Sequence, residues 1–404
     1  MNGMARLLAG SIAALCALAP AAVLGQTPDP ERPTLHIGPV ELKPRLAITN
    51  VGIDNNVFNE RLDPKRDFTF VAAPDLEVSV QPGRLRLAYT SGSEFVYFRE
   101  YTSQRSLNRN FGARADLDLT VIKPFVSIGS AHTSSRANSE IDVRARHHPR
   151  EYTAGTRLKL ASRSELVLTA RENRDSYNDD EEFRGIELAS TLNEKTRGYE
   201  AAFNMALTPF TTAGLVVTRE EERFERSPLR DSNSLRVAPT LTFSPLGLIT
   251  GKASIGYRRF NGLDPSLPDY SGLVASGSVG ILFVGRYKLD TTFTRDVRYS
   301  YEQVVPYYLV SGIRATLAAQ TFGLLELRAL GGRESMTYRV AGDAVPPGFD
   351  RLTSYGAGVG YRVGKHARVV VDFEVSHRAS TRDLWREYRN HRIAASLMWG
   401  TLNR

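Results

Sequence analysis

Histidine and serine are the residues to examine first for metal binding or acid–base catalysis, and the chain has seven histidines. None of them stands at zinc-ligand spacing with a cysteine, and there is no HExxH sequence. Ser376 and His377 are adjacent, so in a strand they point to opposite faces and do not form a nucleophile–base pair. His147 and His148 precede Pro149 in a stretch that we interpret as a solvated loop. The sequence therefore predicts no enzyme, no cofactor and no metal site.

Two charged stretches offer weaker chemistry. The acidic segment NDDEEF, residues 178–183, supplies the oxygen ligands that Ca²⁺ prefers, but it lacks a fixed ligand spacing. The arginines of residues 135–149 have the chemistry to pair with phosphates of lipopolysaccharide. In both places an ordinary solvated loop is the alternative interpretation, and it is favoured for the acidic segment.

The clearest chemical pattern is an alternation of apolar and charged side chains, seen in ARVVVDFEVSHR, residues 367–378. Val371 and Phe373 fall on one set of positions, and Asp372 and Glu374 fall on the other. A period of two indicates a β-strand with one apolar and one charged face. Such a strand fits a soluble sandwich with a wet outer face, or a membrane barrel with a wet lumen.

The same alternation recurs along the chain and assigns a set of charged residues to one face of a sheet. Lys or Arg on a lipid face near the bilayer midplane costs about 2–4 kcal/mol, so in a barrel these charges must face the lumen. The candidate lumen-facing residues are Asp75, Glu77, Arg86, Arg114, Asp116, Asp118, Arg157, Lys159, Arg171, Lys252, Arg258, Lys288, Asp290, Arg314, Glu326, Arg328, Arg368, Asp372 and Glu374. The set leans positive. Either the residues pair across strands and keep the pore hydrated, or they form a basic path.

Eighteen alternating segments account for almost all of the chain after residue 42. They run near 43–52, 67–81, 84–98, 107–121, 124–133, 150–161, 163–173, 193–207, 209–224, 231–243, 248–260, 269–283, 286–298, 304–319, 322–334, 351–363, 366–378 and 386–399. Short links containing Gly, Pro or Ser alternate with long polar links through the whole sequence. An even strand number with short periplasmic turns and long outer loops is typical of an outer-membrane barrel.

The N-terminus predicts export. Arg6 precedes an apolar stretch with small residues before Gln26, so residues 1–25 read as a signal peptide. Residues 26–42 are rich in proline and predict a periplasmic lead-in, and residues 43–404 predict the barrel. The one cysteine, Cys16, lies within the signal, so the mature chain has no disulfide. A closed hydrogen-bonded barrel stabilises an exported chain without disulfides.

Charge and the last strand indicate the partners. The net charge is +8, and for an exported chain the expected counter-charge is lipopolysaccharide or an acidic polymer, with no nucleic acid. In the last strand Ile393, Ala395, Leu397 and Trp399 share one face, which is the kind of terminal strand that the outer-membrane assembly machinery recognises.

The fold class is therefore all-β, a transmembrane antiparallel up-and-down barrel of about 18 strands. A secreted sandwich or solenoid is the rival, and it would need protected sheet edges.

Residues 42–98 contain a motif that resembles the opening of the putative β-barrel porin-2 family. The matching residues are Asp54, Asn55, Asn56, Val57 and Phe58, followed by Pro74 and Leu76 and then by a turn at Gly83 and Arg84. The Asp-Asp of the family pattern is Asp54-Asn55 here. From the residues alone, the motif is interpreted as a turn that leaves the first strand in preference to a role in gating or ligand contact. Beyond this segment the chain fits the family through its strand pattern only.

The resemblance implies a large outer-membrane barrel linked to exopolysaccharide export, supplied with polymer by a periplasmic polysaccharide-export protein. The sequence itself supports a wide, hydrated pore, because about 16–18 strands leave an aqueous channel unless something plugs it. The alternative is a general-diffusion porin or a structural barrel without a polymer substrate. An enzyme that acts on lipid is a distant third hypothesis.

Overall fold

The computed structural model describes residues 34–400 except residues 266, 303–304, 322, 340–347 and 365. The predicted signal peptide, residues 1–25, lies outside the described residues, as do residues 26–33 of the expected lead-in and residues 401–404. No helix among the described residues is both long and apolar enough to cross a membrane.

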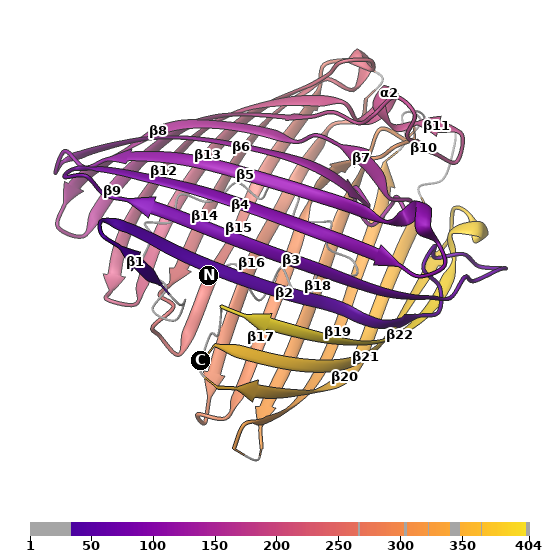
Figure 1. Ribbon diagram of the computed structural model, residues 1–404. Coiled ribbons are helices and arrows are strands. Elements are labelled where there is room, and N and C mark those ends of the chain that lie inside the picture. Colours follow the sequence, from indigo (N-terminus) through magenta and orange to yellow (C-terminus); the bar gives the residue numbers. More distant parts are fainter. Residues whose placement is uncertain are drawn as a thin grey trace.

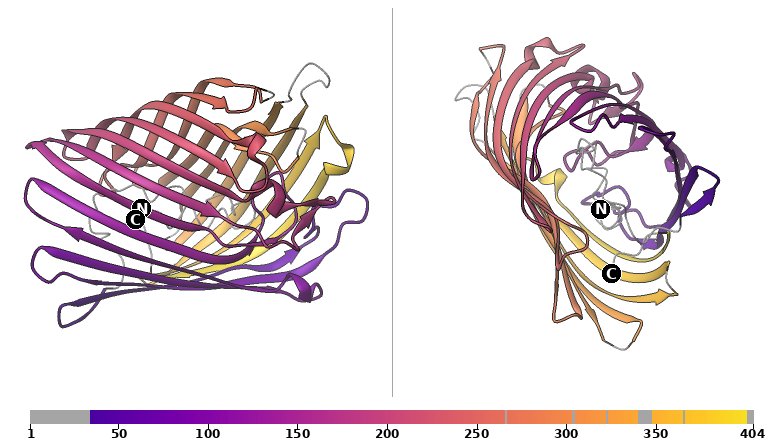
Figure 2. Two further views of the ribbon diagram at one scale, coloured as in Figure 1. Left: turned by 90° about the horizontal axis from the view of Figure 1, so that it is seen from above. Right: turned by 90° about the vertical axis from the view of Figure 1, so that its left-hand side faces the viewer.

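Eighteen long strands of the described chain form the wall of a closed antiparallel barrel (Figure 1). They are β2 (Val40–Asp54), β3 (Asp67–Val80), β4 (Leu85–Phe98), β5 (Ser106–Leu117), β6 (Ile122–Ser135), β8 (Arg150–Ala161), β9 (Ser164–Asp175), β12 (Glu194–Thr208), β13 (Thr211–Phe224), β14 (Ser232–Phe243), β15 (Ile249–Gly262), β16 (Tyr270–Phe283), β17 (Tyr287–Tyr299), β18 (Tyr307–Gln320), β19 (Leu325–Arg339), β20 (Phe349–Val363), β21 (Ala367–Ser380) and β22 (Tyr388–Trp399). Each strand pairs with the next, and β22 pairs with β2, so the ring has no free edge (Figure 2). The predicted all-β barrel is confirmed.

Short elements attach to this wall. They are β1 (Leu35–Ile37), β7 (Ala145–His147), the hairpin β10 (Glu182–Phe183) and β11 (Ile186–Glu187), the helix α2 (Leu188–Leu192), and the 3₁₀ turns η1 (Thr102–Gln104), η2 (Pro228–Arg230) and η3 (Leu384–Arg386). Except for β1, all of them lie in the long links, at the end of the barrel away from the start of β2 and the end of β22. That end is the extracellular side, because outer-membrane barrels have their long loops there.

Several predicted boundaries differ from the structure, by up to five residues at the end of β19, and two of the differences change how residues are interpreted. β2 begins at Val40, inside the expected lead-in, because Val40 and Leu42 continue the apolar alternation and pair with Val80 and Val78 of β3. The strand predicted at 107–121 ends at Leu117, where the chain turns. Asp118 therefore lies in a turn, not in a lumen-facing strand, and its carboxylate accepts hydrogen bonds from the backbone of Thr120 and from Lys123.

The turns on the periplasmic side follow the chemistry of their residues. The link between β16 and β17 turns at Val284 and Gly285, which have φ angles of 53° and 65°. Left-handed conformations at both central residues give a tight hairpin whose twist matches the flanking strands. Tight turns of this kind fix the register of the strands they join.

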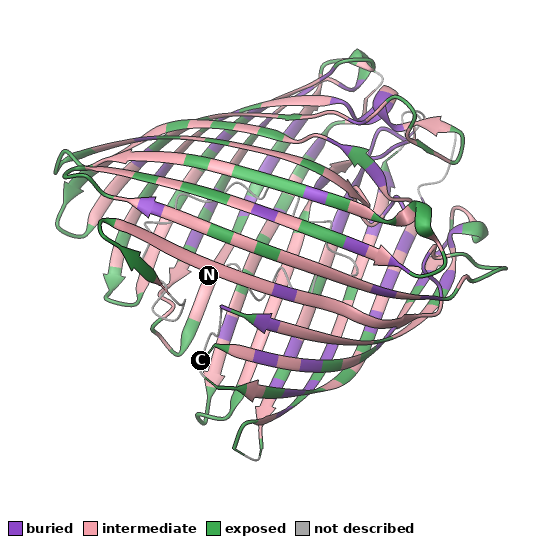
Figure 3. Cartoon of the chain, viewed as in Figure 1, coloured by how far each residue is buried: buried purple, intermediate pink, exposed green. Residues whose placement is uncertain are grey.

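The alternation in sequence becomes an alternation of faces, with exposed positions interleaved with half-buried or buried ones along the strands (Figure 3). In β4, Leu87 and Tyr89 lie exposed on the outer surface, while Arg86 faces inward. In β21, Val371 and Phe373 are 45% and 47% exposed on the outer surface, whereas Asp372 and Glu374 lie on the inner face. The apolar face of these strands therefore lies on the outside of a closed barrel and the charged face lines its lumen, as expected for a membrane barrel and not for a soluble sandwich.

A matched pair of substitutions tests this assignment of faces. Ile255, near the middle of β15, is 59% exposed on the outer face, and its neighbour Ser254 faces inward. We expect Ile255→Lys to lower the free energy of unfolding by about 2–4 kcal/mol, because an ammonium would be placed among acyl chains. Ser254→Lys should change it by no more than about 1 kcal/mol. Urea unfolding of the barrel from phospholipid vesicles measures both values, and equal costs would contradict the assignment.

Candidate functional site: the lumen and its outer mouth

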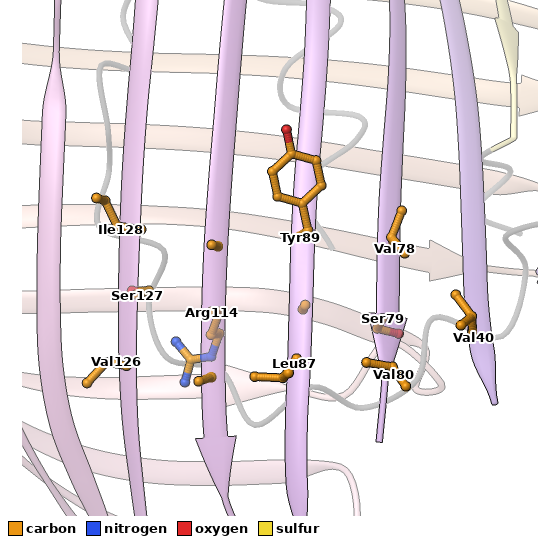
Figure 4. Close-up of a pocket in the computed structure, with 13 residues that line it drawn as sticks. Val40, Val78, Ser79, Val80, Leu87, Tyr89, Arg114, Val126, Ser127 and Ile128 are labelled. Carbon is orange, nitrogen blue, oxygen red and sulfur yellow. The ribbon is translucent and has the colours of Figure 1, made fainter. Parts of the chain in front are cut away.

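An apolar hollow on the barrel wall is the first candidate for a binding site. It has a volume of about 430 Å³ and spans β2 to β6 near the periplasmic side (Figure 4). Its outward-facing lining residues are aliphatic or aromatic: Val40, Val78, Val80, Leu87, Tyr89, Ala113, Ala115, Val126 and Ile128. Since these residues lie on the lipid-facing surface, the hollow is part of the membrane contact and not a solute site. The candidate site is therefore the inner face.

One group of inner charges lies on β18 to β22. Arg328 contacts Asp372 at 2.7 Å and Glu326 at 3.6 Å, and Arg368 also contacts Glu326. Glu374 accepts from Arg314 at 3.1 Å and, on its other side, pairs with Arg392 at 3.2 Å.

Backbone geometry makes room for these contacts. Arg314 of β18 reaches Glu374 of β21, two strands beyond its neighbour β19, which is possible only on the concave inner face. Gly358 of β20 lies directly between Arg328 of β19 and Asp372 of β21 in the strand register. A Cβ atom there would come within 1.9 Å of the Asp372 carboxylate, so glycine allows the ion pairs to lie flat against the wall.

A second group lies on β13 to β17 and centres on Arg258, whose side chain is 5% exposed. Its guanidinium contacts Asp296 at 2.9 Å, Glu222 at 3.4 Å and Glu220 at 3.5 Å. Arg171 also pairs with Glu220. The sequence analysis missed these three carboxylates. Glu220 and Glu222 belong to a run of charges that occupies both faces of β13, so parity alone did not single them out.

A third group lies on β5 to β8. Asp116 accepts from Arg114 at 2.7 Å and from Arg157 at 2.6 Å, and both guanidiniums lie over the ring of Phe125. Arg86 stands directly opposite Asp116 in the register of β4 and β5. Two arginines over one aromatic ring gain cation–π stabilisation in addition to the shared carboxylate.

The other predicted residues are more dispersed. Asp75 and Glu77 pair with Arg45 and Lys43 of β2 at 3.5 and 3.6 Å. The remaining positions are Lys288 and Asp290, 3.8 Å apart, Lys252, half-buried between strands, and Lys159, exposed near the periplasmic end of β8. The structure places the predicted strand residues on the inner face but surrounds most of their cations with carboxylates. The pairing interpretation thus fits better than a basic path.

The outer end of the lumen is crossed by loops, which we call the mouth cluster: residues 136–144, 176–193, 300–302 and 381–387. Its apolar centre packs Ile141 against Leu188, Ala189, Leu192 and Tyr301. Residues 136–144 join β6 to β8, and residues 300–302 join β17 to β18, which stand almost opposite each other in the ring. The contact between them therefore spans the interior of the barrel.

Glu140 is fully buried in the mouth cluster and links its segments. Its carboxylate accepts hydrogen bonds from the Ser300 hydroxyl at 2.7 Å and from the backbone N–H of Tyr301 at 3.3 Å, and Arg386 lies 4.0 Å away. Arg386 in turn contacts Asp350 at 3.0 Å and Glu302 at 3.7 Å. Hydrogen bonds and ion pairs around Glu140 and Arg386 therefore join loop segments that are far apart in the chain.

Further polar contacts tie the cluster to the wall. Asp142 accepts from Arg378 of β21 at 2.6 Å and from Asn59 at 2.8 Å. Arg230 donates to the backbone carbonyls of Ser300 and Glu302. The sequence analysis did not identify this network, since it joins residues from loops that are far apart in the chain.

The motif Asp54–Phe58 supports the mouth cluster from the side. Asn56 is 1% exposed and donates to the carbonyls of Glu60 at 2.7 Å and Arg389 at 3.1 Å, which ties β2 to β22. Asn55 accepts from the backbone of His391 at 2.7 Å. The carbonyl of Val57 accepts from Arg136 at 2.7 Å, and Phe58 packs edge-on against Tyr101 at 4.8 Å. The motif is thus a turn, as one interpretation predicted, and it also anchors residue 136.

The remaining candidates do not assemble into a catalytic or metal site. Across the described residues, no three His, Cys, Asp or Glu side chains converge as metal ligands would. In the acidic segment 178–183, Asp180 and Glu181 pair with Arg146, and Asp179 pairs with Arg226. Asp179 and Asp180 are exposed, as the solvated-loop interpretation predicted, whereas Phe183 at the end of the segment packs against the apolar centre of the mouth cluster.

Comparison with known proteins gives a family and a set of similar folds. The model of the family described as "Putative beta-barrel porin 2" matches residues 35–399. The solved structure of OccK1 (OpdK) from Pseudomonas aeruginosa is 12% identical, with a TM-score of 0.53 over 88% of this chain and 98% of that one. A BenF-like porin from Pseudomonas fluorescens Pf-5 is also 12% identical, with a TM-score of 0.50 over 89% and 99%. The comparison with curated proteins gives no match.

The barrel therefore has the fold of outer-membrane porins, and its location is the bacterial outer membrane. At this level of identity the solved structures establish the fold alone. The lumen described above is that of a porin-like pore.

The mouth cluster predicts a pH dependence. Burial raises the pKa of Glu140 from 4.5 to about 7, although Arg386 and the Ser300 hydroxyl oppose the shift. The stability that neutral Glu140 contributes is complete below about pH 4.5 and is lost as the pH rises through about 7. We therefore expect the open probability in planar bilayers to rise between about pH 5 and 8.

Glu140→Gln should remove this dependence and keep the pore closed, because glutamine resembles the neutral acid. Glu100→Gln, at an exposed residue of another outer loop, is the control, and its open probability should depend on pH in the same way as that of the wild type. An open probability that is independent of pH in the wild type, or that rises as the pH falls, would contradict the role of Glu140.

Proposed function

Since the chain belongs to the putative beta-barrel porin 2 family, we propose that it is a gated outer-membrane conduit for an exported exopolysaccharide. The observation that supports this most is a lumen lined by paired charges and crossed at its outer mouth by loops held through polar contacts. A porin-family barrel is typically not an enzyme, and we propose no catalytic step for this one.

The inner wall suits a hydroxyl-rich polymer. Pairs such as Arg328 with Asp372 and Arg157 with Asp116 present donors and acceptors side by side with little net charge. A sugar hydroxyl both donates and accepts, so it can bind at many successive places along such a wall. Carboxylates of an acidic polysaccharide can compete with Asp372 or Asp116 for the same arginines. A small-anion filter, by contrast, needs cations without carboxylate partners.

The two ends of the barrel suit export. Short turns leave the periplasmic end without large loops, and we propose that a periplasmic polysaccharide-export protein delivers the polymer there. At the outer end the mouth cluster would act as a gate. Its hydrogen bonds to Glu140 and Asp142 are replaceable by bonds to a passing polymer.

A second candidate is a pore for small organic solutes. One similar solved structure, at a TM-score of 0.51 and 12% identity, is OpdK with vanillate, a small aromatic acid. In that case the arginine-rich groups of the lumen would bind a carboxylate of the solute in place of a protein carboxylate.

A locking experiment separates the candidates. In the deletion strain, surface exopolysaccharide should be lost, and the wild-type gene should restore it. The side chains of Asn59, in the link between β2 and β3, and Asp142, in the link between β6 and β8, lie 2.8 Å apart, and the only native cysteine is Cys16 in the predicted signal. A short bis-methanethiosulfonate, which forms a disulfide with each cysteine and releases sulfinate, should therefore lock the double variant Asn59→Cys/Asp142→Cys in a form that reductant can open. Locking should stop polymer release, and reductant should restore it.

Each single cysteine variant, treated with the same reagent, is the matched control and should continue to export. Unchanged surface polymer in the deletion strain would rule out the export proposal. Small-anion conductance of the purified barrel, together with unchanged polymer, would favour the second candidate.

A further inference from the structure

A row of cations crosses the outer wall of the barrel on four neighbouring strands. Arg150 of β8 stands directly opposite Arg174 of β9, Arg174 opposite Lys195 of β12, and Lys195 opposite Arg223 of β13. Nothing in the lumen or the mouth cluster uses this row, because these residues have the outward parity of their strands. Like charges directly opposite each other destabilise a sheet, so we expect an interaction that compensates the repulsion within this row.

The outward direction is shown by the residues on the same face. Tyr152, Leu168 and Tyr199 belong to β8, β9 and β12 and are 41%, 41% and 52% exposed. They lie on the membrane side of the row, since the row is within two residues of the outer ends of these strands. The row is therefore at the level of the outer-leaflet headgroups, where exposed tyrosines are also typical.

The row continues into what we call the outer cationic patch: Arg150, Arg174, Lys195, Arg197 and Arg219, together with Glu172 and Glu221. Five cations thus face two carboxylates. Glu172 alone is shared by Arg174 at 2.6 Å, Lys195 at 2.9 Å and Arg197 at 3.1 Å. In the part of the chain that the structure describes, Arg150 has no carboxylate within ion-pair distance, and its side chain is exposed.

Arg223 completes the row but faces away from the patch. Its guanidinium donates to the carbonyl of Ser232 at 2.7 Å and to the side chain of Asn233 at 2.9 Å, on β14. The unsatisfied charge is therefore concentrated over β8, β9 and β12. Over these strands the patch has four cations for the single carboxylate of Glu172, so it carries an excess of positive charge that an anion from outside the chain can balance.

We propose that the outer cationic patch binds the phosphates of lipopolysaccharide in the outer leaflet. Arginine guanidiniums bind phosphate through paired, charge-assisted hydrogen bonds, and Arg150 and Arg174 present two of them side by side. The acyl chains of the same lipid would lie over Leu168 and the tyrosines below. A soluble polymer inside the pore does not reach this surface, because the patch is outside the barrel. The proposal is independent of what the pore transports.

The test uses the folded barrel in detergent, titrated with bisphosphorylated lipid A and, separately, with lipid A stripped of its phosphates. Native mass spectrometry counts the bound lipid. We expect the wild type to bind the phosphorylated form and to bind the stripped form at least about tenfold more weakly, because each lost charge-assisted hydrogen bond is worth about this factor. The triple variant Arg150→Gln/Arg174→Gln/Lys195→Gln should show the same loss with phosphorylated lipid A.

The matched control is Arg259→Gln/Arg295→Gln/Arg333→Gln, which removes three outward arginines that lie on separate strands, β15, β17 and β19. It should bind like the wild type. Should the triple patch variant fail to fold, Arg150→Gln alone breaks no ion pair and should still weaken binding. Unchanged binding in the patch variants, or an equal loss in the control, would overturn the proposal.

Discussion

The structure depends on one constraint: within the bilayer, every backbone N–H and C=O must find a partner in the protein. Eighteen strands that pair in sequence, with β22 returning to β2, meet this constraint without a free edge. Once the ring is closed, each strand has one lipid face and one lumen face. Val371 and Phe373 face lipid, and Asp372 and Glu374 face the lumen, because the chain has no other low-energy way to place them.

The charges of the inner face then organise the interior. Arginines such as Arg258 and Arg328 are 5% and 4% exposed, and buried charges of this kind need nearby carboxylates. The result is a wall of local ion pairs that reach across two or three strands. The same requirement operates at the outer mouth, where Glu140, Arg386 and Asp350 are buried together in loops that come from opposite sides of the ring. The wall and the mouth cluster are thus both held by hydrogen bonds and ion pairs between buried or half-buried side chains.

Local sequence patterns were sufficient to predict the strands of the barrel wall and the faces of their charged residues. The period of two fixed the existence of all eighteen strands, and the parity of Arg328, Arg368, Asp372 and Glu374 placed them on the inner face, since both are properties of a few consecutive residues. Glu220, Glu222 and Asp296 were missed because charges on both faces of β13, and on both faces of β17 at Arg295 and Asp296, obscure the parity. The mouth cluster depends on contacts such as Glu140 with Ser300, for which no local pattern exists. Its one signal in sequence was the apolar set Leu188, Ala189 and Leu192 in an otherwise polar outer loop.

The most direct measurement is a scan of single spin-labelled cysteines along β21, from Val369 to Ser376, in the barrel reconstituted in phospholipid vesicles. Two relaxation agents are compared, oxygen, which concentrates in hydrocarbon, and a water-soluble nickel chelate. The account predicts that accessibility to both agents oscillates with a period of two and in opposite phase, with oxygen maxima at Val369, Val371 and Phe373 and nickel maxima at Val370, Asp372 and Glu374. Equal access of the nickel chelate to both sets of positions would contradict a sealed wall between lipid and lumen.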